Sequence, residues 1–149
     1  MAVRYYEQEV KAGLSDRRKL SGFLQAMIRS RREHLKKLDL TYIFCDEAYL
    51  LEINRQYLNH DTHTDIITFD LSESEDHLQG EVYISVDMVQ ENAGRFNETY
   101  QQELHRVIFH GALHLCGLKD KKPEDQAAMR RAEDDWLAAY ATGLAGKKN

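Results

Sequence analysis

The chain has 149 residues and a formal net charge of −5, with 42% hydrophobic and 30% charged side chains. This length suits one domain, and the composition is typical of a folded protein, which excludes collagen-like, proline-rich and disordered classes. No apolar run approaches the roughly 18 residues of a membrane span, and the first residues lack the apolar core of a secretion signal. Because two cysteines are too few for a disulfide framework, we expect a cytoplasmic protein whose thiols are small buried residues.

The first part of the chain predicts two strand–helix pairs. Residues 2–8 have the pattern of a short strand, and residues 16–34 that of a helix with Ser15 as its cap. Residues 38–45 are rich in β-branched and aromatic side chains, which is typical of a strand, and Asp46 caps the helix that follows. The apolar stripes expected to face the core are Leu20, Phe23, Leu24, Met27 and Ile28 in the first helix, and Tyr49, Leu50, Ile53 and Tyr57 in the second.

The middle of the chain predicts a hairpin and a short helix. Residues 65–71 and 81–85 have the pattern of strands, and the acidic, polar residues between them indicate an exposed hairpin loop. A helix is predicted over residues 87–93, where Gly94 is expected to end it because glycine readily adopts the left-handed conformation found after helices.

Two longer helices complete the predicted fold. Thr99 and Gln102 form a capping-box pattern that opens the first of them, and Gly117 ends it. Pro123 lies just inside the start of the last helix. The core-facing residues are expected to be Leu104, Val107, Ile108 and Leu115, followed by Met129, Trp136 and Leu137. The chain is therefore expected to form one α+β domain over residues 1–149, with one mixed four-stranded sheet packed by about five helices.

Two histidines lie four positions apart on the first of these longer helices. His110 and His114 project from the same face, one turn apart, where two imidazole nitrogens can bind one metal ion. Gly117 breaks the helix and lets the chain turn back, so that Asp120 can supply a third ligand. Because three protein ligands and an open position are typical of catalytic zinc, we predict one divalent ion, Zn²⁺, at these side chains. Cys116 is an alternative soft ligand, but it points away from the histidines if the helix continues.

Three other interpretations of this spacing are possible. A histidine pair one turn apart is also common on helix surfaces and in satisfied cores. Metallopeptidases share the spacing, but they place a glutamate general base directly after the first histidine, where this chain has Gly111. Because a helical glycine costs about 1 kcal/mol relative to alanine, Gly111 is expected to allow close approach of a strand or a substrate. A 2-His-1-carboxylate iron site fits the ligands, but the many-stranded β pattern usual for such sites is lacking.

Other polar residues could serve the same site. Glu103 lies seven positions before His110 on the same helix face, where it could orient a ligand or transfer a proton. The alternative is a surface carboxylate paired with Arg106, while His105 lies off this face and is expected to pack or meet solvent. The residues of a polar loop that predicts turn chemistry only are His60, Asp61, His63 and Asp65.

Positive charge gathers at the start of the chain. Residues 1–40 contain ten Lys and Arg against five Asp and Glu, whereas the rest of the chain contains ten against twenty. This distribution permits a focused contact with a polyanion, although a solvated helix face explains it equally well. The negative total argues against a protein that coats nucleic acid by bulk electrostatics.

Four segments together resemble the YbeY family of bacterial endoribonucleases, also described as ribosomal-RNA maturation factors. The segments are His110-Gly111-x-Leu113-His114-Leu115-x-Gly117, Asn54-Arg55-x-Tyr57, Thr64-Asp65-Ile66-Ile67-Thr68-Phe69 and Gly80-Glu81-Val82-Tyr83-Ile84-Ser85. They occur in the expected order between about residues 40 and 135, which makes this resemblance far more specific than a single motif.

Two positions depart from the family pattern. The family signature usually ends in Asp-His, with that histidine as the third metal ligand, whereas this chain has Lys119-Asp120. A carboxylate therefore replaces an imidazole. The family also usually has an arginine with a role toward RNA after the tyrosine that matches Tyr57, and here that position is Leu58. Arg55 or the basic first helix could take over this contact.

The resemblance implies a metal-dependent single-strand endoribonuclease that processes ribosomal RNA precursor during ribosome maturation, with a ribosomal subunit as partner and neither DNA nor a membrane. The residues expected to contact RNA are Arg55, Arg17, Arg18, Arg31 and Arg32. The sequence does not indicate which residue is the general base. The alternative is a non-catalytic, metal-binding ribosome-assembly factor, which Leu58 keeps open, and a metallopeptidase is disfavoured by Gly111.

Overall fold

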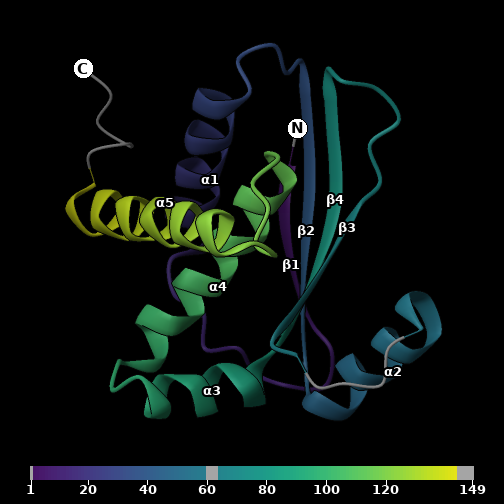
Figure 1. The fold of residues 1–149 in the computed structure, drawn as a ribbon, viewed down its shortest axis with the longest axis vertical. Coiled ribbons are helices and arrows are strands. Elements are labelled where there is room, and N and C mark those ends of the chain that lie inside the picture. The colour runs from purple at the N-terminus through teal and green to yellow at the C-terminus, as the bar shows by residue number, and fades with distance from the viewer. Residues whose placement is uncertain (1, 60–63, 144–149) are drawn as a thin grey trace.

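Figure 1 shows a computed structural model that describes residues 2–59 and 64–143. One four-stranded sheet has the order β1-β2-β4-β3. Its strands are β1 (Ala2–Glu7), β2 (Lys37–Cys45), β3 (Ile66–Asp70) and β4 (His77–Ser85). β1, β2 and β4 run parallel, while β3 pairs antiparallel with β4 at one edge. The predicted mixed four-stranded sheet is confirmed.

Within the described residues, five helices pack around this sheet, as predicted. They are α1 (Arg17–Arg31), α2 (Glu47–Leu58), α3 (Val86–Arg95), α4 (Tyr100–Leu115) and α5 (Pro123–Thr142). In Figure 1, α1, α4 and α5 lie on one side of the sheet, while α2 lies on the other side at one end. Among the described residues, no helix is both long and apolar enough to cross a membrane.

The main core lies between the sheet and the helices of the first side. Alternate residues of β2 and β4 point into it, because side chains along a strand alternate between the two faces. The buried members on these strands are Leu38, Leu40, Tyr42 and Phe44 of β2, and Leu78, Val82 and Ile84 of β4. Tyr42 also donates a hydrogen bond of 2.8 Å to the carbonyl of Ile108, which ties α4 to the centre of the sheet.

A smaller apolar cluster lies under α2 on the opposite face of the sheet. Cys45, Leu50 and Ile67 form its buried centre. The predicted apolar stripe of this helix is wrong in part, because Tyr49 and Tyr57 are 38% and 66% exposed. Since α2 covers only one end of the sheet, a full stripe has nothing to pack against.

Helix ends follow local chemistry closely, with two corrections. Asp46 and Thr99 cap α2 and α4 as predicted, and the capping box of α4 is complete. α1 is capped by Asp16, whose side chain accepts from the amide of Lys19, and Ser15 is not its cap. α3 continues through Gly94 to Arg95, since the amide that closes the helix belongs to Phe96. The polar loop predicted around His60 and His63 lies outside the described residues.

At Gly111, α4 lies close against the sheet. A Cβ atom there would lie 2.8 Å from Cγ1 of Val82 and 3.2 Å from Cδ1 of Ile66. The absent side chain therefore allows a strand to approach the helix, which is one of the two reasons predicted for this glycine.

Gly111→Ala is expected to lower the free energy of unfolding by about 1 kcal/mol, because overpacking costs about 1–3 kcal/mol and outweighs a gain in helix propensity of about 1 kcal/mol. Gly22 in α1 is the matched control, since nothing lies within 4 Å of a Cβ at that position. Gly22→Ala should therefore raise the free energy of unfolding. Urea unfolding of both variants measures the difference, and two shifts of the same sign would contradict the packing argument.

Candidate metal centre and the adjoining pocket

The His110 side chain is held between two carboxylates that come from different segments. Its Nδ1 lies 2.7 Å from Oε2 of Glu133 on α5, and its Nε2 lies 3.1 Å from Oδ2 of Asp120 in the α4–α5 connection. Because a carboxylate only accepts hydrogen bonds, Nδ1–H must donate to Glu133. This contact fixes the orientation of the ring and directs Nε2 toward Asp120.

Glu133 is the centre of a buried ionic network. Its side chain is 7% exposed, and its Oε1 accepts from Nη1 of Arg106 at 3.1 Å. Nη2 of Arg106 lies 2.9 Å from Asp134, and Arg130 approaches Glu133 at 3.6 Å. A buried carboxylate with two cationic partners and an imidazole is held in one position, which is what a residue that orients His110 requires.

The carboxylates also set the protonation of His110. Burial on its own lowers the pKa of the imidazole, but the hydrogen bond and charge of Glu133, with the charges of Asp120 and Asp65, outweigh it and raise the pKa. His110 is thus poised to carry positive charge at this position, and the surrounding carboxylates favour a cation there.

The three predicted metal ligands are brought together only in part. His114 is exposed, and its ring lies parallel to that of His110 with 6.5 Å between centroids. Within residues 2–59 and 64–143, no group of three His, Cys, Asp or Glu is arranged to hold a metal ion. The donor chemistry of the predicted set nevertheless suits zinc. Two ligands on one tetrahedral zinc ion are about 3.3 Å apart, close to the 3.1 Å between Nε2 of His110 and Oδ2 of Asp120.

Cys116, the alternative ligand, packs against the main core. Burial raises the pKa of its thiol to about 11, despite the nearby charges of Arg31 and Arg32. Asp120, by contrast, lies 3.1 Å from Nε2 of His110.

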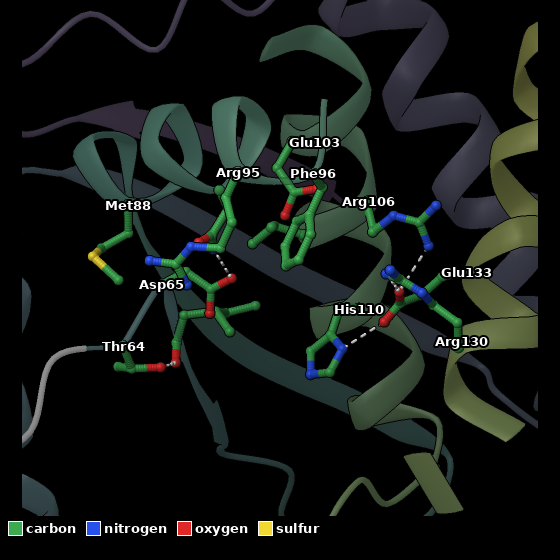
Figure 2. Close-up of a pocket in the computed structure, with 13 residues that line it drawn as sticks. Thr64, Asp65, Met88, Arg95, Phe96, Glu103, Arg106, His110, Arg130 and Glu133 are labelled. Atoms are coloured by element: carbon green, nitrogen blue, oxygen red, sulfur yellow. Dashed lines mark hydrogen bonds and ion pairs between the residues drawn. The ribbon is translucent and has the colours of Figure 1, made fainter. Parts of the chain in front are cut away.

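Two hollows meet at His110. One pocket of about 460 Å³ extends from His110 toward α3, and Figure 2 shows the side chains that line it, with Arg95, Phe96 and Glu103 projecting into it. A second hollow of about 490 Å³ lies on the other side, between β3 and the end of α2. His114, Asp120 and Leu58 line this second hollow. Leu58 thus occupies the candidate site at the position where the family usually has arginine.

The arginine side chains beside His110 are not the ones that the sequence predicts to contact RNA. In the described part of the chain, the arginines predicted to contact RNA line neither hollow beside His110: Arg17, Arg18, Arg31, Arg32 and Arg55. Arg31 and Arg32 line a separate hollow near the β3–β4 loop. The arginines that line the pocket of Figure 2 are Arg95, Arg106 and Arg130. Sequence reasoning missed Arg95, Arg130 and Glu133, because their positions depend on how α3 and α5 pack against α4.

Glu103 is buried, which corrects the interpretation of a surface carboxylate paired with Arg106. Its residue is 4% exposed, and its Oε1 has no hydrogen-bond partner among the described residues. Burial, with the nearby charge of Asp65, raises the pKa of Glu103 to about 7. Burial likewise raises the pKa of Asp65, which accepts a hydrogen bond of 3.4 Å from Asn92.

The raised pKa of Glu103 makes the stability of the fold depend on pH. Between pH 4.5, the ordinary value, and about 7, the folded chain holds a proton that the unfolded chain releases. The contribution of Glu103 to the free energy of unfolding should therefore fall by an amount on the order of 2 kcal/mol as pH rises through this range, and then stay level. Glu103→Gln should remove this fall and raise the melting temperature at pH 8. Thermal melts between pH 4 and 8 test this, with Glu75→Gln in the exposed β3–β4 loop as control. An unchanged slope in Glu103→Gln would refute it.

Comparison with known proteins agrees with this architecture. A family model described as endoribonuclease YbeY matches residues 5–141. The endoribonuclease YbeY of Bacteroides thetaiotaomicron is 44% identical, over 93% of this chain and 98% of its own length. That of Parabacteroides distasonis is 42% identical, over 93% of this chain and 95% of its own. A Thermotoga maritima protein solved in solution shares the fold, with a TM-score of 0.59, 22% identity, and coverage of 97% of this chain and 95% of that chain. This chain belongs to the endoribonuclease YbeY family, as its four sequence segments predict.

Proposed function

We propose that the chain cleaves single-stranded ribosomal RNA precursor, with one divalent ion held by His110, His114 and Asp120. Family membership makes it an endoribonuclease, a hydrolase of phosphodiester bonds within RNA. The observation that carries the proposed centre is the His110 ring, held by Glu133 at 2.7 Å on one nitrogen and facing Asp120 at 3.1 Å with the other. Two imidazoles and a carboxylate are ligands that suit zinc.

The chain's own residues have distinct tasks in this proposal. Glu133 accepts a hydrogen bond from Nδ1–H of His110 and so keeps Nε2 directed at the ion site. Arg95 and Arg130 are exposed at the pocket, where their guanidinium groups can bind RNA phosphates. When bound, the ion supplies Lewis-acid polarisation of the scissile phosphate and acidifies a water molecule.

A cleavage assay tests this function directly. Tag-free protein is stripped of metal, reloaded with one equivalent of zinc, and incubated with labelled single-stranded RNA or with casein. We expect RNA cleavage only by the reloaded protein and no cleavage of casein. Elemental analysis of the untreated protein should give close to one divalent ion per chain. RNA binding without cleavage under any metal would instead support the non-catalytic assembly factor, and casein cleavage would support a peptidase.

Binding of RNA should depend steeply on salt, because cations that contact phosphates release counterions. If the basic α1 helix contributes, replacing Arg17, Arg18, Arg31 and Arg32 together by alanine should weaken binding and reduce the slope of log affinity against log salt. Fluorescence anisotropy from 50 to 300 mM salt measures the slope. If the variant with all four substitutions keeps the slope of the unmodified chain, the RNA contact belongs to the arginines of the pocket instead.

A further inference from the structure

The pocket beside the candidate metal centre contains more polar groups than the metal requires. His110 and Glu133 belong to the ionic network already described, and they lie at one end of the pocket. Glu103, Phe96 and Arg95 line it from the side of α3 and the start of α4. A volume of about 460 Å³ is in the range of small-ligand sites.

Two residues that line this pocket each carry a buried polar atom without a hydrogen-bond partner among the described residues. The atoms are Oε1 of Glu103 and Nε of Arg106, both shielded from solvent. Each terminal nitrogen of Arg106 already contacts a carboxylate, Nη1 at 3.1 Å from Glu133 and Nη2 at 2.9 Å from Asp134, whereas its Nε has no hydrogen-bond partner among the described residues. An unpaired buried polar atom costs about 1–3 kcal/mol. A ligand that supplies an N–H to Glu103 and an acceptor to Arg106 would satisfy both atoms.

An aromatic ring also lines this pocket. Phe96 closes α3 and lines the pocket, although its side chain is 51% exposed. Stacking of bases on exposed aromatic rings is common in proteins that bind single strands. Exposed side chains change rotamer within nanoseconds, so the ring can move to admit a planar ligand.

We propose that this pocket binds one unpaired nucleobase, stacked on Phe96, with its Watson–Crick edge on Oε1 of Glu103 and Nε of Arg106. The inference rests on the proposed function, since it takes RNA as the ligand. Every base presents a donor next to an acceptor on that edge, so the pair of protein atoms selects unpaired bases rather than one base. In a duplex the same edge is occupied by the partner strand, and the pocket therefore explains a preference for single-stranded RNA.

A modified base tests the contact between the Watson–Crick edge and Glu103 separately from stacking and from phosphate contacts. Heptauridine and hepta-3-methyluridine have the same backbone and comparable stacking, but the methyl group replaces the N–H of the Watson–Crick edge. Binding is measured by fluorescence anisotropy at pH 8 in EDTA, where RNA is not cleaved. We expect heptauridine to bind the unmodified chain at least about 5-fold tighter than the methylated probe. Glu103→Leu should remove this difference, and Glu103→Gln should retain part of it because its amide oxygen can accept.

Stacking is tested separately with a matched pair of aromatic residues. Phe96→Ala should weaken binding of both probes by about 5- to 100-fold. Tyr6→Ala should leave both unchanged, because Tyr6 is 56% exposed on β1, away from this pocket. Equal binding of the two probes by the unmodified chain, or binding by Phe96→Ala at the parent's strength, overturns the inference. Either result leaves the metal-dependent cleavage assay unaffected, so the failure of this subsite and the failure of the proposed function are distinguishable.

Discussion

Asp120→Ala is expected to weaken zinc affinity more than 100-fold and to abolish RNA cleavage, with His114→Ala producing the same loss. The loss should exceed the 10–100-fold typical of a group that only orients a ligand, because a direct metal–oxygen bond disappears. Asp120→His should keep the ion, since imidazole nitrogen coordinates zinc at about 2.0–2.1 Å, much as a carboxylate oxygen does. It also restores the residue usual in the family at this position.

Competitive zinc titration of the metal-stripped variants measures these affinities. Cys116→Ser is the control, because Cys116 packs against the core and is not expected to bind the ion. The opposing hypothesis is that Asp120 only accepts a hydrogen bond from His110 at 3.1 Å. It predicts near-normal zinc affinity for Asp120→Ala, and that result would remove Asp120 from the ligand set.

Glu133→Ala should damage both the fold and the centre. Removing a buried carboxylate deprives Arg106 of one partner and His110 of the acceptor at 2.7 Å. Because breaking a buried pair costs about 3–5 kcal/mol and Arg106 retains Asp134, we expect a loss of about 2–3 kcal/mol in the free energy of unfolding. Zinc affinity and cleavage should fall about 10–100-fold, since the orientation of His110 is lost.

The neighbouring residue gives a matched control for this effect. Asp134 also contacts Arg106, at 2.9 Å, but its side chain is 57% exposed and is not among the carboxylates that hold His110. Asp134→Asn should therefore change the free energy of unfolding by less than about 1 kcal/mol and leave zinc affinity unchanged. Chemical unfolding and zinc titration distinguish the two variants. If both variants lose the same free energy of unfolding and the same zinc affinity, the effect comes from the loss of a partner of Arg106 and not from the contact with His110.

The parts of the fold that are encoded locally could be predicted from the sequence. The capping box of Thr99 and Gln102, the cap of Asp46 and the proline at the start of α5 depend on neighbours within a few positions, and all are present. The error at α2 has a tertiary cause. Tyr57 has the correct spacing for a core stripe, but the sheet extends beneath only part of that helix, and its ring packs edge-on against Phe69.

The candidate site was predictable only where it lies on one helix. The spacing of His110 and His114 reveals a shared face, and the helix break at Gly117 suggests Asp120, where the family usually has histidine. Glu133 lies 23 positions after His110, and nothing in the sequence of α5 singles out this carboxylate among its acidic neighbours. Its role emerges only when α5 packs across α4. The burial of Glu103 could not be predicted from the sequence for the same reason, because Glu103 on an isolated helix would be exposed to water.

The packing at Gly111 couples the interior of the protein to its chemistry. Gly111 directly follows His110, and there α4 lies close against Val82 and Ile66. A larger side chain at either of these two buried or half-buried positions would push the helix outward and carry His110 with it. Larger side chains at Val82 and Ile66 should therefore make RNA cleavage by the purified chain sensitive to temperature, whereas substitutions at the exposed positions of α2 should not. In the Val82 and Ile66 variants the loss of cleavage would precede unfolding on heating.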